Sequence, residues 1–109
     1  MDTPKDDIES NTTQIASGCQ ILCFTTGRGT PVGAPSAPVI KITGNPFTSD
    51  KTQNEIDVNA GTIIQGRESI DVAGVEVFAE PLEVVSGRLT KAELLGYQEF
   101  CINRVGPSY

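Results

Sequence analysis

The chain has 109 residues and a formal net charge of −6 at pH 7, because 14 Asp and Glu outnumber 8 Lys and Arg. This length suits a single domain, and the acidic balance disfavours nucleic acid as a partner, since phosphates attract a basic surface. The apolar runs are too short to cross a bilayer, so no membrane partner is expected either. Three cysteines without Cys-x-x-Cys spacing favour reduced core thiols in a cytoplasmic protein: Cys19, Cys23 and Cys101.

The first part of the chain predicts one helix and then two strands. Asp6 can cap the helix, and Gly18 can end it in a left-handed conformation. Residues 20–24 are apolar without alternation, which predicts a strand buried on both faces of a parallel sheet. A loop rich in Gly, Thr and Pro follows over 25–38, and residues 39–43 predict the second strand.

The middle of the chain predicts one long helix. The polar stretch 44–54 is expected on the surface, and 56–64 shows no simple period. Ser69 can cap a helix that Gly87 ends, and Pro81 is expected to kink or split it because proline removes a helical hydrogen bond. Its predicted apolar stripe consists of Ile70, Ala73, Val77, Phe78, Val84 and Val85.

The last part of the chain completes an alternation of helices and strands. Thr90 and Glu93 have the spacing of a capping box for a short helix before Gly96, and residues 99–103 predict a last strand. Helices between apolar strands predict an α/β layered domain with a mostly parallel sheet of about four strands flanked by helices.

The loop after the first strand is the strongest candidate for a binding site. Open α/β sheets place ligands at such strand ends, and two glycines around Arg28 let backbone N–H groups turn toward an anion. The guanidinium offers a planar fork to a carboxylate or phosphate. The alternative is a structural turn with an exposed Arg. The predicted substrate-binding residues here are Thr25, Thr26, Gly27, Arg28, Gly29 and Thr30.

Several segments resemble the C-terminal portion of the altronate dehydratase/galactarate dehydratase family. They are Met1-Asp2-Thr3-Pro4, residues 24–33, Pro38-Val39-Ile40-Lys41, Asp57-Val58-Asn59-Ala60-Gly61, Ser86-Gly87 and Glu99-Phe100-Cys101-Ile102. Sulfolactate sulfo-lyase large subunits are similar in the same segments. The resemblance implies a Rossmann-like domain that is a fragment of a larger lyase, whose remaining polypeptide would be its partner. It also implies a divalent metal, typically Fe²⁺, and a sugar-acid substrate.

Further candidates for catalysis lie outside the loop. Asp57 and Asn59 alternate by two and would face one cleft if extended, whereas the alternative is an Asx turn before Gly61. Lys41 lies within an apolar strand, where a lowered pKa would make it a base, and the alternative is a lysine on the solvated face. Asp2 is a candidate acid or ligand at a strand end, or else a frayed terminus.

The implied chemistry is the loss of water from a sugar acid. Removal of the proton α to a carboxylate leaves an enediolate whose charge needs a cation, and a second group protonates the departing β-hydroxyl. The sequence contains no His, so an imidazole ligand or base would come from outside the chain, and we expect the fragment alone to be inactive. A sulfo-lyase domain and a non-catalytic anion-binding module are the alternatives. A bare sheet edge could also give a homo-oligomer.

Overall fold

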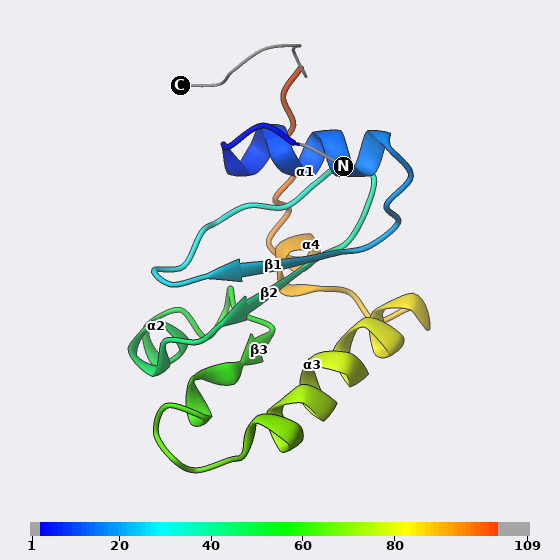
Figure 1. Cartoon of the computed structure of the whole chain (residues 1–109). Helices are drawn as coiled ribbons and strands as arrows, with labels where there is room; N and C mark the ends of the chain where they lie inside the picture. The colour runs from blue at the N-terminus through cyan, green and yellow to red at the C-terminus, as the bar shows by residue number, and fades with distance from the viewer. Residues whose placement is uncertain (1–2, 103–109) are drawn as a thin grey trace.

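Three parallel strands form the central sheet in the order β1-β2-β3 (Figure 1). The computed structural model describes residues 3–102. The strands are β1 (Leu22–Thr26), β2 (Val39–Thr43) and β3 (Val58–Asn59). The α/β class and the parallel pairing agree with the prediction, while the sheet of residues 3–102 is smaller than the expected four strands.

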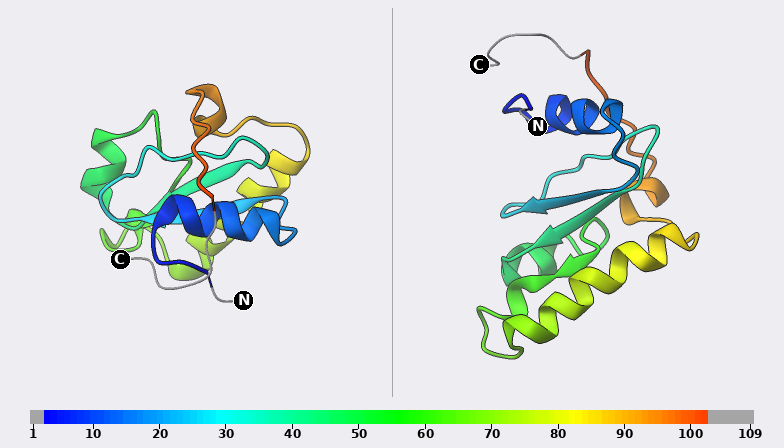
Figure 2. Two further views of the ribbon diagram at one scale, coloured as in Figure 1. Left: turned by 90° about the horizontal axis from the view of Figure 1, so that it is seen from above. Right: turned by 45° about the vertical axis from the view of Figure 1, so that its right-hand side comes forward.

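Helices lie on both sides of this sheet. In Figure 1, α1 lies beyond β1 at one side and α3 beyond β3 at the other, and Figure 2 shows the same order from two further directions. No helix among residues 3–102 is both long enough and apolar enough to cross a membrane. The helices are α1 (Asp7–Ala16), α2 (Pro46–Lys51), α3 (Ile70–Val85), α4 (Lys91–Leu94) and the 3-10 helix η1 (Ala60–Thr62).

The central strand β2 carries the core, because every one of its residues is buried. Successive side chains of a strand point to opposite faces. Ile40 and Ile42 pack on one face with Val58 of β3 and Val84 of α3. The other face, which includes Lys41, lies under α4 and the segments around it. Full burial of each aliphatic side chain contributes about 1.5–3 kcal/mol to the stability of the fold. Strand β2 therefore stabilises the packing on both faces of the sheet.

The edge strand β1 differs from its predicted environment. The expected strand 20–24 begins and ends two residues later, and its exposure alternates instead of being buried throughout. Cys23 and Thr25 are exposed, and so is Cys19 before the strand. Among the described residues β1 is an edge strand that pairs with β2, and the face that carries Cys23 and Thr25 is not covered by another element. The prediction of core thiols is therefore wrong for Cys19 and Cys23.

The predicted last strand is absent, although Asn103 lies outside the described residues. Residues 99–102 have no regular structure because their polar groups bind elsewhere. The Glu99 carboxylate accepts a hydrogen bond from the Gly33 N–H at 2.9 Å. The Cys101 N–H donates to the Thr12 hydroxyl of α1 at 3.2 Å. These contacts carry the segment past the long loop and α1 instead of along a sheet edge.

The helix boundaries predicted from capping residues are confirmed. Gly18 follows α1 with φ of +109°, and Gly87 follows α3 with φ of +113°. Ser69 caps α3 by accepting the Val72 N–H, and Thr90 forms the predicted capping box of α4. Asp6 stands at the cap of α1, although its side chain makes no capping hydrogen bond. The residues that cap a helix act locally, so the sequence identifies them.

Pro81 neither splits α3 nor ends it. The helix runs through Pro81 from Ile70 to Val85, because buried residues anchor it on both sides of the proline, namely Ala73 and Val84. The predicted apolar stripe is correct for these two residues and for Val77, which packs against the core. It is wrong for three others, which are exposed: Ile70, Phe78 and Val85.

The stretch 44–54 contains a short helix as well as surface loop. Asn45 caps α2 by accepting the Phe47 N–H at 3.0 Å, and Pro46 occupies the first helical position. Asn followed by Pro is a helix-start pattern that the sequence reading overlooked. The undecided stretch 56–64 forms β3 and then η1.

Candidate functional site

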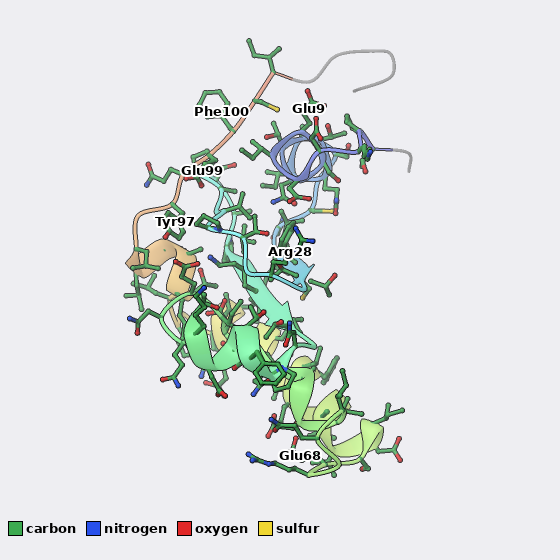
Figure 3. The ribbon with its side chains drawn as sticks, turned by 90° about the vertical axis from the view of Figure 1, so that its left-hand side faces the viewer. Glu9, Arg28, Glu68, Tyr97, Glu99 and Phe100 are labelled. Carbon is green, nitrogen blue, oxygen red and sulfur yellow. The ribbon has the colours of Figure 1, made fainter. Side chains whose placement is uncertain are left out.

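Three segments follow the strands at the carboxyl edge of the parallel sheet. Residues 27–30 follow β1, residues 44–47 follow β2, and residues 60–62 follow β3. Figure 3 views the molecule from this side, with Arg28 near the ends of the strands. The carboxyl edge is the place where open α/β sheets bind ligands. The glycine-rich loop therefore lies at the carboxyl end of a parallel strand, as predicted.

Hydroxyl groups hold the turn that presents Arg28. The Gly29 N–H donates to the Thr26 hydroxyl at 3.1 Å, and the hydroxyls of Thr26 and Thr30 lie 3.2 Å apart. Gly29 has φ of +84°, a backbone conformation that residues other than glycine rarely adopt. Thr26 and Thr30 thus bind the loop itself, whereas Thr25 is exposed beside it.

Helix α2 fixes the same loop from its other side. The Gly27 carbonyl accepts hydrogen bonds from the Thr48 hydroxyl at 2.7 Å and from the Asn45 side-chain amide at 3.2 Å. Thr48 is buried. Sequence reasoning missed both residues, because they lie about twenty positions from the loop that they hold. The cap signal at Asn45 was the only pattern that pointed toward them.

Arg28 is exposed in the described part of the chain. Four pockets on the faces of the domain are lined by other residues. The predicted pocket around this guanidinium stays a prediction. Loop 27–30 and the start of α2 are held together beside Arg28 by the hydrogen bonds to the Gly27 carbonyl. Arg28 is available to a molecule that approaches the carboxyl edge.

Lys41 is buried beneath the loop. Its exposed fraction is 0%, so the alternative of a solvated lysine is wrong. The ammonium Nζ donates to the Thr30 carbonyl at 3.3 Å and lies 4.8 Å from the centre of the Tyr97 ring. Burial lowers the pKa of Lys41, as expected for a charge taken out of water. Three nearby carboxylates act in the opposite direction on that pKa: Glu55, Asp57 and Glu99.

The lowered pKa of Lys41 predicts that this residue contributes a gain in stability as the pH rises through that pKa toward about 10, whereas the raised pKa values of Cys23, Tyr97 and Cys101 contribute the opposite slope. In this window the unfolded chain holds a proton on Lys41 that the folded chain has released, so raising the pH favours the folded state. Urea unfolding of the wild type and of a Lys41 variant at several alkaline pH values measures the contribution of Lys41 as the difference between their slopes. Lys41→Met is expected to remove it, whereas Lys51→Met, at an exposed position, is expected to retain it. Equal slopes in the wild type and Lys41→Met would contradict the prediction.

Asp57 joins the sheet to the start of α4. Its Oδ2 accepts the Lys41 backbone N–H at 2.8 Å, and its Oδ1 accepts the Lys91 backbone N–H at 2.9 Å. The N–H of Asp57 donates in turn to the Lys41 carbonyl at 2.9 Å. Both carboxylate oxygens are therefore engaged in holding backbone together. This arrangement favours a positioning role for Asp57 over proton transfer.

Asp57 and Asn59 both line a pocket of about 480 Å³ between β3 and α3. The Asn59 side-chain oxygen accepts the Gly61 N–H at 2.9 Å, so the Asx turn is present as well. The remaining charged groups of this pocket are Glu68, Glu76, Glu80, Glu83 and Arg88. Arg88 is paired with Glu80. The excess of carboxylates makes this pocket unfavourable for an acidic substrate.

A complete metal site is not present in the described part of the chain. Residues 3–102 contain no group of three or more His, Cys, Asp or Glu side chains placed to hold a metal ion. These residues therefore do not by themselves fit the divalent metal that the resemblance implies. Asp2, a candidate acid or ligand, lies outside the described residues.

Comparison with known sequences decides the family. Residues 1–108 match the family described as D-galactarate/altronate dehydratase, C-terminal. The chain belongs to this family. The resemblance inferred from its motifs is thereby confirmed over nearly the whole chain.

Curated relatives of the chain are much longer proteins. Galactarate dehydratase (L-threo-forming) of Escherichia coli (strain K12) is 42% identical over 79% of this chain and 16% of its own length. The (2R)-sulfolactate sulfo-lyase subunit beta of Chromohalobacter salexigens is 34% identical over 96% of this chain and 27% of its own length. Altronate dehydratase of Bacillus subtilis (strain 168) is 32% identical over 97% of this chain and 21% of its own length. The chain thus spans between about a sixth and a quarter of these relatives.

Proposed function

We propose that the chain is the C-terminal domain of a hydro-lyase that dehydrates a sugar acid such as galactarate or altronate. The observation that supports this proposal most directly is the family match over residues 1–108. The 42% identity to a galactarate dehydratase favours a substrate of that class. The carboxyl-edge loops, with Arg28 exposed among them, give the domain a surface suited to a carboxylate.

The proposed reaction removes the proton α to a carboxylate and then expels the β-hydroxyl as water. The intermediate places additional negative charge on the carboxyl group, so a cationic donor aimed at it lowers the barrier. A guanidinium can bind both carboxylate oxygens at once, which orients the substrate as well as attracting it. Arg28 is the residue of this chain to which we assign that contact.

The backbone of the loop would assist Arg28. Gly27 lets the chain pass close to an anion, and the exposed Thr25 hydroxyl lies beside it. Thr26 and Thr30 bind the loop internally, so we assign them to holding its shape. Because Arg28 is exposed in this domain, the opposite wall of the site would come from the rest of the polypeptide.

The proton-transfer groups are proposed to lie outside the described residues. Lys41 is enclosed, and both oxygens of Asp57 are hydrogen-bonded to backbone, so we assign these two residues to positioning the loop and the strands. The rest of the polypeptide would hold the general base and the ligands of a divalent metal, for which we propose Fe²⁺. Asp2 remains a candidate for either role.

The isolated chain is accordingly expected to show no turnover. The test is an assay of the purified 109-residue chain with galactarate or altronate and Fe²⁺, in which formation of a 2-keto acid is measured. The full-length protein, assayed under the same conditions, is the positive control. Substantial turnover by the isolated chain would show that its own residues supply the base, and no turnover by the full-length protein would contradict the proposed function.

A sulfo-lyase domain is the second candidate, because the sulfolactate sulfo-lyase subunit matches 96% of the chain. The carboxylate contact would be the same, and the leaving group would be sulfite instead of hydroxide. Supplying the full-length protein with sulfolactate and measuring sulfite separates this reaction from dehydration. Binding of a sugar acid with neither product would favour the third candidate, a non-catalytic anion-binding module.

A further inference from the structure

The side of α3 that faces away from the sheet is apolar. Four side chains form this outer stripe of α3, and each is at least half exposed: Val75, Phe78, Leu82 and Val85. The Phe78 side chain, the largest of the four, is 70% exposed. Their spacing of three, four and three residues places them along one face of the helix. Figure 1 shows this side of α3 free of other elements among the described residues.

The opposite side of α3 already packs on the core. Ala73 and Val84 are buried, and Val77 packs against the cluster of Ile40, Ile42, Val58 and Val84. A helix that is apolar on both sides is typical of a helix buried between two layers. One of these layers is the sheet. The outer stripe therefore requires a second layer that the described residues do not supply.

The charges on α3 restrict what that second layer can be. The helix carries four acidic residues, Asp71, Glu76, Glu80 and Glu83, and no Lys or Arg. A helix that lies on a lipid surface normally has Lys and Arg on its polar face, so a membrane is disfavoured. Three of these carboxylates, Glu76, Glu80 and Glu83, line the pocket between β3 and α3, so they do not border the outer stripe. The surface complementary to the outer stripe is therefore apolar.

We propose that the outer stripe of α3 is the interface on which the rest of the full-length dehydratase packs. This inference rests on the proposed function, because it requires the chain to be one domain of a larger lyase. The relatives support it, since the matched segment is 16% of the E. coli galactarate dehydratase and 27% of the sulfo-lyase subunit. An apolar patch of this kind on a domain is what an interface within a larger protein provides.

The test uses a single polypeptide in which this chain replaces the matching C-terminal segment of the E. coli galactarate dehydratase, with a protease site before Met1. After cleavage, size-exclusion chromatography with mass measurement shows whether the chain remains bound to the larger piece. We expect it to remain bound in the wild type. Phe78→Asp is expected to weaken this binding at least tenfold, since buried aromatic residues dominate interfaces.

Leu94→Asp is the matched control, because Leu94 is 67% exposed on α4, away from the outer stripe. This variant is expected to remain bound. Circular dichroism of each isolated variant shows that the domain is folded, and both should unfold close to the wild-type temperature. Release of the wild-type chain as a monomer, its elution as a dimer of itself, or retention of Phe78→Asp would each overturn the proposal.

Activity of the uncleaved polypeptide separates this inference from the proposed function. Binding that depends on Phe78 without turnover of galactarate would support the interface and contradict the function. Turnover combined with release after cleavage would support the function and contradict the interface.

Discussion

Arg28→Ala is expected to lower kcat/KM of the full-length dehydratase by about 10²-fold, the loss of a charge-assisted bidentate contact to a substrate carboxylate. Because the contact binds the carboxylate before and during proton removal, KM should rise as well as kcat fall. Arg28→Lys should recover only part of the activity, since an ammonium cannot form the planar fork. Steady-state kinetics with the sugar acid measures all three effects.

The substitution Arg28→Ala should leave the stability of the fold unchanged. Arg28 is exposed, and replacement of an exposed side chain usually changes stability by less than about 0.5 kcal/mol. Arg67 is also exposed and lies in a different loop, so Arg67→Ala is the matched control and should leave kcat/KM unchanged. Wild-type kinetics in Arg28→Ala would remove this residue from the site.

Asp57→Ala is expected to destabilise the domain by about 3 kcal/mol, since hydrogen bonds to a charged group contribute roughly 1.5–3 kcal/mol each. The substitution leaves the backbone N–H groups of Lys41 and Lys91 without their acceptor. It thereby loosens the connection between β2 and α4. Urea unfolding of the isolated chain, followed by circular dichroism, measures the change in free energy of unfolding.

Two further variants show whether the loss comes from these two hydrogen bonds. Asp57→Asn keeps one acceptor oxygen and should recover part of the stability. Asp50→Ala removes an exposed carboxylate from α2 and should change the free energy of unfolding by less than about 0.5 kcal/mol. A wild-type midpoint in Asp57→Ala would show that the carboxylate is dispensable to the fold, and would restore Asp57 as a candidate for proton transfer.

The carboxyl-edge loop was identified from sequence because its signals are local. An apolar strand followed at once by Thr, Gly and Arg predicts a turn at the end of that strand, and Gly29 adopts the positive φ that such a turn allows. The exposure of Arg28 has no local signal. The exposure of Arg28 depends on which other segments fold over it, and these lie far away in the chain or outside it.

Lys41 illustrates the same limit within the domain. Its position in an apolar strand left a buried base and a solvated lysine as equal alternatives. Tyr97, whose ring lies 4.8 Å from its ammonium, comes more than fifty residues later in the sequence. The packing of this late segment against β2 decides the burial and hence the lowered pKa of Lys41.

By itself the sequence determined the family, the ends of α1, α3 and α4, the side-chain caps of α3 and α4, and the buried strand β2. These features depend on hydrogen bonds and apolar spacing within a few neighbouring residues. Only the tertiary structure decided that β1 is half exposed, that 99–102 forms no strand, and that α3 is apolar on its free side. Burial is a property of segments that pack together, and segments remote in sequence come together only in the folded chain.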